Sequence, residues 1–140
     1  CLWTARGHGP QPHSLRAIVF AILLCTGSAF TPSSKAELKA ATDAWVSDAS
    51  AAEATYGHIS GWDTSLITDM SYLFCGSSWG DECDPAYANF NEDIGAWQTG
   101  AVTSMAHMFT YAYAFNQDIS KWDVSSGTKN KPMSLDDGAV

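Results

Sequence analysis

Cys75 and Cys83 are the residues of this chain best suited to covalent chemistry, and both lie in one short polar segment. Thiols at this separation could form a disulfide, hold a metal ion or supply a nucleophile. No histidine lies between them, and the C-x-x-C spacing typical of zinc sites is absent. In an oxidising compartment such a pair is typical of a disulfide. We therefore predict a Cys75–Cys83 disulfide that contributes about 2–3 kcal/mol to stability.

A hydrolytic site would need a histidine, an acid and a nucleophile. Outside the first 29 residues the candidates of the first two kinds are His58, His107, Asp63, Asp69, Glu92 and Asp93. The two histidines occupy unrelated positions of the repeat described below, and no serine or cysteine stands at a recognisable nucleophile elbow. The sequence therefore predicts no enzymatic activity.

The acidic run Asp81-Glu82 with Asp84 could suggest calcium. Calcium takes six to eight oxygen ligands, and this run is not the twelve-residue loop that supplies them in EF-hands. We expect a solvated acidic loop, with no metal site and no cofactor.

Aromatic side chains outside the regular part of the repeat are the candidates for ligand contact: Trp79, Tyr87, Tyr111 and Tyr113. Such rings can stack on sugars or bury against a protein partner. Tyr111 and Tyr113 could instead pack between turns of the chain, so Trp79 is the best candidate for exposure. The predicted partner is an extracellular protein or glycan.

The elements that position these residues come from a repeated phrase. Ile59-x-x-Trp62-Asp63-x-Ser65 returns as Ile94-x-x-Trp97 and as Ile119-x-x-Trp122-Asp123-x-Ser125, and a Thr-x-Met-x-x-hydrophobic-Phe segment follows the first two copies. The last interval is 25 residues and the first is longer, because about 75–88 is an insertion. Such a period predicts stacked units with a shared core. The predicted core residues are Ile59, Trp62, Met70, Phe74, Phe90, Ile94, Trp97, Met105, Phe109, Phe115, Ile119 and Trp122.

Each unit is expected to contain two short elements. Ile-x-x-Trp predicts a short extended segment, and Met-x-x-hydrophobic-Phe predicts one or two helical turns. Asn91 and Asn116 are expected to bond to the backbone of neighbouring units. Ahead of the repeats, Ser34 and Glu37 form a capping box for a helix over 34–49. Trp45 on its apolar stripe would close the open end of the stack.

Residues 1–29 have the features of a secretory signal peptide: two arginines, a short apolar run over 17–25 and small residues before the predicted cleavage site. The apolar run is too short to span a membrane; a buried core helix is the alternative. Without this segment, five lysines remain against fifteen acids, a net charge of about −10. This charge repels nucleic acids and anionic membranes. We expect a secreted or cell-surface protein with no nucleic-acid partner and no membrane insertion of the mature part.

The phrase F-N-x-D-I-S-x-W-D-V-S-x-V-T-x-M-x-x-M-F resembles the repeat of BspA-like leucine-rich-repeat surface proteins of bacteria and protists. Residues 115–125 and 102–109 carry the match, with 59–74 in the first copy. The resemblance implies a surface-displayed solenoid used in adhesion or ligand contact, without catalysis.

Period and resemblance together predict the fold class: an α/β repeat, a short leucine-rich-repeat-like solenoid with a short strand and a short helix per unit. The expected layout is a signal peptide over 1–29, a capping-helix region over 30–55, repeats over 56–126 and a disordered or truncated tail over 127–140. The predicted function is a non-catalytic adhesion or ligand-binding scaffold. The alternative is a fragment of a larger secreted protein, an enzyme or a carbohydrate-binding protein, in which the repeats are an accessory module.

Overall fold

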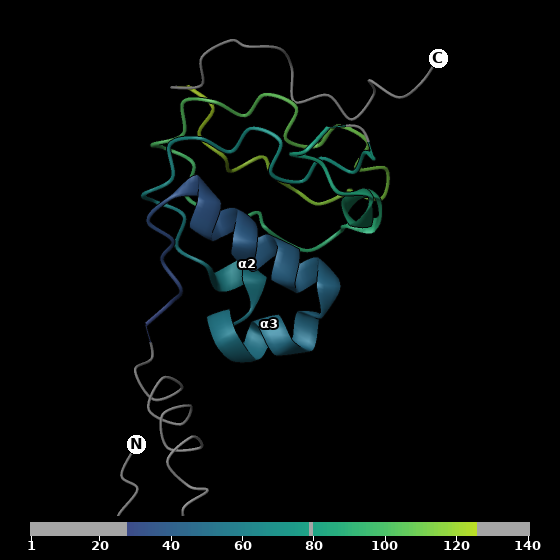
Figure 1. Cartoon of the computed structure of the whole chain (residues 1–140). Helices are drawn as coiled ribbons and strands as arrows, with labels where there is room; N and C mark the ends of the chain where they lie inside the picture. Colours follow the sequence, from purple (N-terminus) through teal and green to yellow (C-terminus); the bar gives the residue numbers. More distant parts are fainter. Residues whose placement is uncertain (1–27, 79, 126–140) are drawn as a thin grey trace, which may run out of the picture.

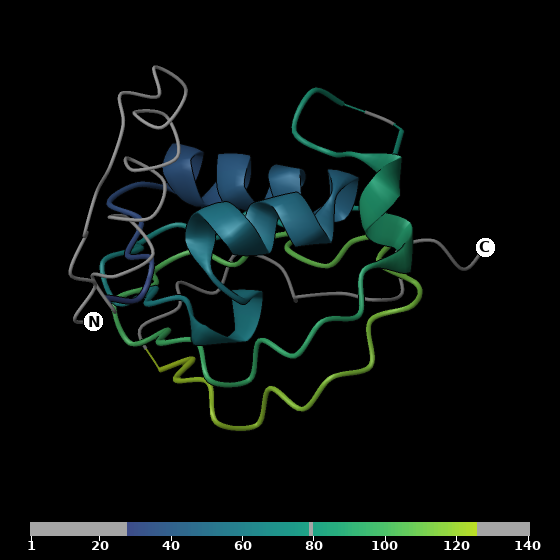
Figure 2. The ribbon, with the colours of Figure 1, turned by 90° about the horizontal axis from the view of Figure 1, so that it is seen from below.

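The computed structural model describes residues 28–78 and 80–125. Its helices are α2 (Lys35–Ser47) and α3 (Ala49–Tyr56), with short 3₁₀ helices at η1 (Ile59–Gly61) and η2 (Pro85–Asn89). Figure 1 shows the repeat copies as winding coils that lie side by side, with α2 and α3 packed together below them. Figure 2 gives the same arrangement from a perpendicular direction. The predicted signal peptide, apart from residues 28 and 29, and the predicted tail lie outside the described residues. No helix of 28–78 and 80–125 has the length and apolarity needed to cross a membrane.

Helix α2 begins at the predicted cap. The Ser34 side chain accepts a hydrogen bond from the Glu37 N–H at 3.2 Å. The Glu37 carboxylate accepts from the Ser33 N–H at 2.8 Å, one residue earlier than a capping box requires. The buried face of α2 consists of Leu38, Ala41, Thr42 and Trp45.

The helix predicted over 34–49 is followed by a second one. Helix α2 ends at Ser47, and the extended Asp48 caps α3 by accepting from the Ala51 N–H at 3.1 Å. Ala52 is the buried residue of α3. The helix therefore depends on the high helix propensity of its alanines and on its cap, and it has no apolar stripe for a pattern search to find.

The predicted α/β leucine-rich-repeat solenoid is wrong. Residues 28–78 and 80–125 contain no strand and no sheet, and one isolated parallel bridge pairs Asp69 with Ser104. The Ile-x-x-Trp segment is a turn, because the N–H of Trp97 bonds to the carbonyl of Ile94 at 3.1 Å. A bond across three residues bends the chain back on itself, which an extended strand cannot do.

The predicted helical turns of the Met-x-x-hydrophobic-Phe segments are also absent. Tyr72 and His107 stand at the same position of two copies and have φ angles of 58° and 56°. These angles belong to the left-handed region, which ends any right-handed helical turn. The spacing of apolar residues is that of a helix, but the backbone forms single turns.

Backbone hydrogen bonds join the first two copies at matching positions. The N–H groups of Met70, Tyr72, Phe74 and Gly76 donate to the carbonyls of Ser104, Ala106, Met108 and Thr110, at 2.8–3.0 Å. The intervening N–H groups of Leu73 and Cys75 bond within their own copy. Alternate groups thus pair across and within copies, which satisfies the buried backbone without a regular sheet.

Each later tryptophan of the repeat bonds to the preceding copy. Trp97 Nε1 donates to the carbonyl of Ile59 at 2.8 Å, and Trp122 Nε1 donates to that of Ile94 at 3.1 Å. The rings of Trp62 and Trp97 stack with centroids 6.1 Å apart. The Ile-x-x-Trp spacing therefore sets both the acceptor and the donor that hold successive copies in register.

Most of the residues predicted for the core are buried: Ile59, Trp62, Met70, Phe74, Phe90, Ile94, Trp97, Phe109, Phe115 and Trp122; Met105 and Ile119 are partly buried. Phe74 stacks on Phe90 at 4.4 Å, and the equivalent Phe109 stacks on Phe115 at 4.2 Å. From α2, Trp45 packs edge-on against Trp62 at 6.0 Å and covers the first copy. Between copies, the Asn91 side chain accepts from the N–H of Asn116 at 2.8 Å.

The Asp-x-Ser parts of the repeat form turns closed by the aspartate. Asp63, Asp118 and Asp123 each accept the N–H of the serine two residues later, at 2.9–3.0 Å. Hydrogen bonds from the serine hydroxyl and N–H lower the pKa of all three carboxyls. We refer to these three as the Asp-x-Ser turns.

Candidate functional site

A groove of about 470 Å³ lies between α2, the first repeat copy and the inserted segment. Its lining residues are Lys35, Ala36, Lys39, Asp43, Ser71, Tyr72, Asp81 and Glu82. We call it the α2 groove. The lysines of the described residues are Lys35, Lys39 and Lys121, so most of their positive charge borders this one groove.

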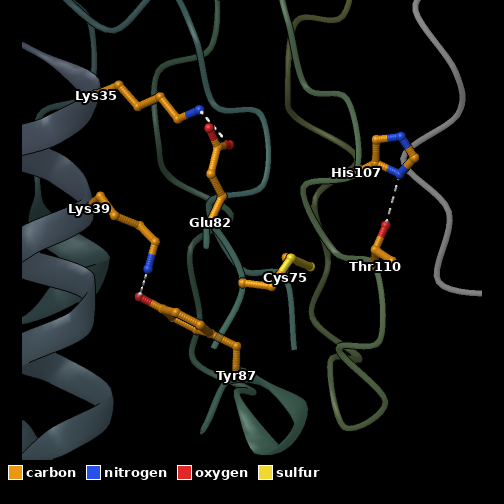
Figure 3. Close-up of a disulfide and its surroundings, with 8 residues drawn as sticks. Lys35, Lys39, Cys75, Glu82, Tyr87, His107 and Thr110 are labelled. Carbon is orange, nitrogen blue, oxygen red and sulfur yellow. Dashed lines mark hydrogen bonds and ion pairs between the residues drawn. A yellow bond between two sulfur atoms is a disulfide. The ribbon is translucent and has the colours of Figure 1, made fainter. Parts of the chain in front are cut away.

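Lys35 is held from three sides. Its ammonium donates to Ser71 Oγ at 2.8 Å and lies 3.6 Å from Asp69 Oδ2 and 3.7 Å from Glu82 Oε2. Figure 3 shows the side chain reaching from α2 towards Glu82. Burial raises the pKa of Asp69, but the hydrogen bonds from Ser71 and the neighbouring Lys35 hold it below its ordinary value. Because these groups are partly exposed, the ion pairs position the side chains more than they stabilise the fold.

Tyr87 is fully buried, so its prediction as a contact residue is wrong. Its hydroxyl lies 2.6 Å from Asp43 Oδ1 and 2.8 Å from Thr42 Oγ1, both on α2. The Lys39 ammonium lies 4.6 Å from the ring centroid, donates to the Tyr87 hydroxyl at 3.4 Å (Figure 3) and also pairs with Asp43. Burial, reinforced by Asp43, raises the pKa of Tyr87. The neutral phenol therefore anchors the inserted segment to α2.

The predicted disulfide is present and closes the start of the inserted segment. Cys75 and Cys83 are bonded, with their Cα atoms 4.8 Å apart. Asp81 and Glu82 lie within the ring that this bond closes, on the wall of the α2 groove. The disulfide therefore limits how far Glu82 can move from Lys35 (Figure 3).

Tyr72 and His107 form an exposed aromatic pair. Their rings stack with centroids 5.0 Å apart and planes 20° apart, and both side chains are partly exposed. A bulky side chain at left-handed φ costs roughly 1–2 kcal/mol, whereas glycine and asparagine adopt it more cheaply. Tyr72 and His107 thus place aromatic rings at two positions whose left-handed backbone favours glycine or asparagine.

A second hollow has a volume of about 220 Å³. It is lined by residues that follow Tyr72 and His107 in the two copies: Gly76, Ser77, Ser78, Tyr111 and Tyr113. Tyr111 is partly exposed and also has a positive φ of 59°, and Tyr113 is 67% exposed. Their rings meet edge-on at 6.0 Å. We refer to Tyr72, His107, Tyr111 and Tyr113 as the exposed aromatic set. Trp79 lies outside the described residues.

The candidate hydrolytic residues are dispersed over the fold. His58 Nδ1 lies 2.7 Å from Ser60 Oγ, and His107 Nδ1 lies 3.3 Å from Thr110 Oγ1; both partners are near neighbours in sequence. Asp93, like the Asp-x-Ser carboxylates, accepts the N–H two residues later. Within the described ranges, no group of three or more histidines, cysteines or acids could hold a metal ion.

Sequence reasoning missed Lys35, Lys39 and Tyr72, and it considered His107 only for hydrolysis. Two signals could have found them. Lysines four residues apart lie on one face of a helix. The ring-bearing residues Tyr72 and His107 occupy the same variable position of successive repeats, which places them side by side.

These features define a small repeat protein that is closed by a helical pair at one end and carries an aromatic, charged surface. Residues 43–136 match the family described as "Mycoplasma protein of unknown function, DUF285". The match covers more than half of the chain, which therefore belongs to this family. No curated protein and no solved structure matches the chain.

Proposed function

We propose that the chain is a non-catalytic binding module, secreted or displayed at the cell surface, that contacts an extracellular protein or glycan. The observation that carries this proposal is the exposed aromatic set. Tyr72, His107 and Tyr111 have left-handed backbone conformations that their side chains disfavour. Backbone strain concentrates at functional sites, and partly exposed rings are typical of binding surfaces.

Three further features support a role outside the cell. The Cys75–Cys83 disulfide is of a kind that persists in oxidising compartments. The formal net charge of −8 opposes binding to nucleic acids. The repeat sequence also resembles that of BspA-like surface proteins, which favours adhesion over catalysis.

An array of glycans and extracellular matrix proteins, probed with the full chain, tests the binding function. The variant that combines Tyr72→Asn, His107→Asn and Tyr111→Asn removes three rings, and asparagine suits the left-handed backbone. The wild type should bind at least one ligand, and the variant should remain folded and bind it about tenfold more weakly or worse. An array without any bound ligand, or equal binding by the variant, would contradict the proposal.

Trapping of thiols by alkylation in intact cells tests the proposed location. Protein that acts outside the cell should carry Cys75 and Cys83 as a disulfide that blocks alkylation. Quantitative labelling of both cysteines in the native host would instead place the chain in a reducing compartment and contradict the extracellular role.

A further inference from the structure

We infer that the α2 groove binds a neutral oligosaccharide, with Tyr72 as the platform on which a sugar ring stacks. The inference rests on the proposed binding function and names its ligand class and its site. Three properties of the groove support it: an aromatic wall, a mixed set of hydrogen-bonding groups and a nearly balanced charge.

The aromatic wall is the Tyr72 ring. The ring stacks on His107 of the second copy, and Tyr72 is also a lining residue of the α2 groove. The ring face that does not contact His107 is therefore the one we assign to a ligand in the groove. The C–H-rich face of a hexose packs well on such a ring, since the ring offers a flat apolar surface with a negative π-face.

The rim of the groove supplies donors and acceptors together. The ammonium groups of Lys35 and Lys39 donate, the carboxylates of Asp43, Asp81 and Glu82 accept, and the Ser71 hydroxyl can do both. A sugar hydroxyl donates one hydrogen bond and accepts up to two, so it requires such a mixture. An apolar ligand would displace water from these groups without replacing its hydrogen bonds, which disfavours it.

Charge selects among polar ligands. The lining contains three carboxylates and two ammonium groups, so one negative charge is in excess. Acidic sugars and phosphates are repelled by this balance. A basic peptide would have to displace Lys35 from Glu82 and Lys39 from Asp43, which lie in existing ion pairs. A neutral polyol can bond to these groups without breaking the pairs.

The size and support of the groove suit an oligosaccharide. A volume of about 470 Å³ lies within the range of roughly 300–1,000 Å³ found for small-molecule sites. Its walls are fixed by α2 on one side and by the disulfide-closed loop, anchored through Tyr87, on the other. A wall held in place before binding lowers the entropic cost of association.

Titration of the full, disulfide-bonded chain with neutral trisaccharides of glucose, galactose, mannose and N-acetylglucosamine, and with trimers of galacturonic acid, tests the inference by calorimetry and NMR. The variant Tyr72→Asn removes the platform and suits the left-handed backbone; Leu66→Asn, which replaces an exposed apolar side chain outside the groove lining, is the control. At least one neutral trisaccharide should bind, about tenfold more weakly to Tyr72→Asn and equally to Leu66→Asn. Amide shifts in the wild type should centre on Lys35, Ser71 and Tyr72, which keeps the test valid if a variant fails to fold.

Each other outcome overturns the inference in a recognisable way. Preference for the galacturonic acid trimer would refute the charge argument. Sugar binding that shifts Tyr111 and Tyr113, or that persists in Tyr72→Asn, would place the site elsewhere. Absence of sugar binding, with a matrix protein still bound on the array, would refute the glycan ligand and leave the binding function standing.

Discussion

Restoring the repeat phrase at Gly95 should destabilise the protein. The first and third copies have serine at this position, so the repeat pattern favours Gly95→Ser. In the structure, a Cβ atom on Gly95 would lie 2.4 Å from the carbonyl oxygen of Asp118 in the next copy and 3.3 Å from Asp93 Oδ1. The first of these atoms is backbone, so the second and third copies would have to separate. Their separation would strain the bond from Trp122 to Ile94.

The magnitude follows from two opposing effects. Overpacking of this kind costs about 1–3 kcal/mol. Replacing glycine lowers the entropy of the unfolded chain and offsets about 0.4–1 kcal/mol. The net loss of about 1–2 kcal/mol corresponds to a fall in Tm of roughly 4–16 °C for a domain near 100 residues.

Gly100→Ser is the matched control, because serine also stands at this position in the first and third copies. The nearest atom to a Cβ at Gly100 is Asp123 Oδ2, at 3.9 Å, which is an ordinary contact. The unfolding free energy of Gly100→Ser should stay within about 0.5 kcal/mol of that of the wild type. Urea and thermal unfolding followed by tryptophan fluorescence measure both variants. If Gly95→Ser is as stable as Gly100→Ser, the close approach of the copies at Asp118 is incorrect.

Three further outcomes are expected. Trp97→Phe should cost about 0.5–1.5 kcal/mol more than Trp45→Phe in urea unfolding, because it removes the shorter of two hydrogen bonds to the carbonyl of Ile59 and leaves only the 3.4 Å bond from the N–H of Trp62, whereas Trp45 Nε1 has no hydrogen-bond partner in the described part of the chain; equal costs would contradict this. Removing the disulfide by Cys75→Ser and Cys83→Ser should lower stability by about 2–3 kcal/mol, measured against the oxidised wild type, and an unchanged midpoint would refute its role. Folding lowers the pKa values of the three aspartates in the Asp-x-Ser turns. These carboxylates therefore stabilise the folded state at pH values above the pKa of an aspartate in the unfolded chain, about 4, and this stabilisation is lost as the pH falls through their pKa values in the folded state. Unfolding free energy should therefore fall on acidification below about pH 4, and replacing the three serines by alanine should reduce this slope; an equal slope would argue against the turns.

The sequence predicts the contents of the core better than the path of the backbone. The repeated Trp and Phe positions identify buried residues because apolar rings at a fixed period have to pack against one another. The same pattern cannot separate a helical turn from a single turn, since both bring residues i and i+3 together. The difference lies at Tyr72 and His107, whose left-handed conformations have no sequence signal because neither is glycine or asparagine.

The α2 groove was not predictable for a related reason. It depends on the inserted segment folding back onto α2, where one buried tyrosine, Tyr87, anchors it beside the Lys35–Glu82 ion pair. Composition placed Tyr87 in a polar loop, where an aromatic residue can serve either as a contact residue or as an anchor. Only the spatial approach of Asp43 and Thr42 distinguishes the two roles.

The stacked phenylalanine pairs have a consequence for how this chain tolerates change in length. Phe74 and Phe90 are joined by sixteen residue steps and Phe109 and Phe115 by only six, yet both pairs close to within 4.4 Å. The chain leaves and re-enters the stack at two phenylalanines that contact each other, so the length of the segment between them does not change how the copies align. A peptide tag or epitope grafted between Phe109 and Phe115 should therefore leave the stacking of the copies intact, as the natural insertion does in the first copy.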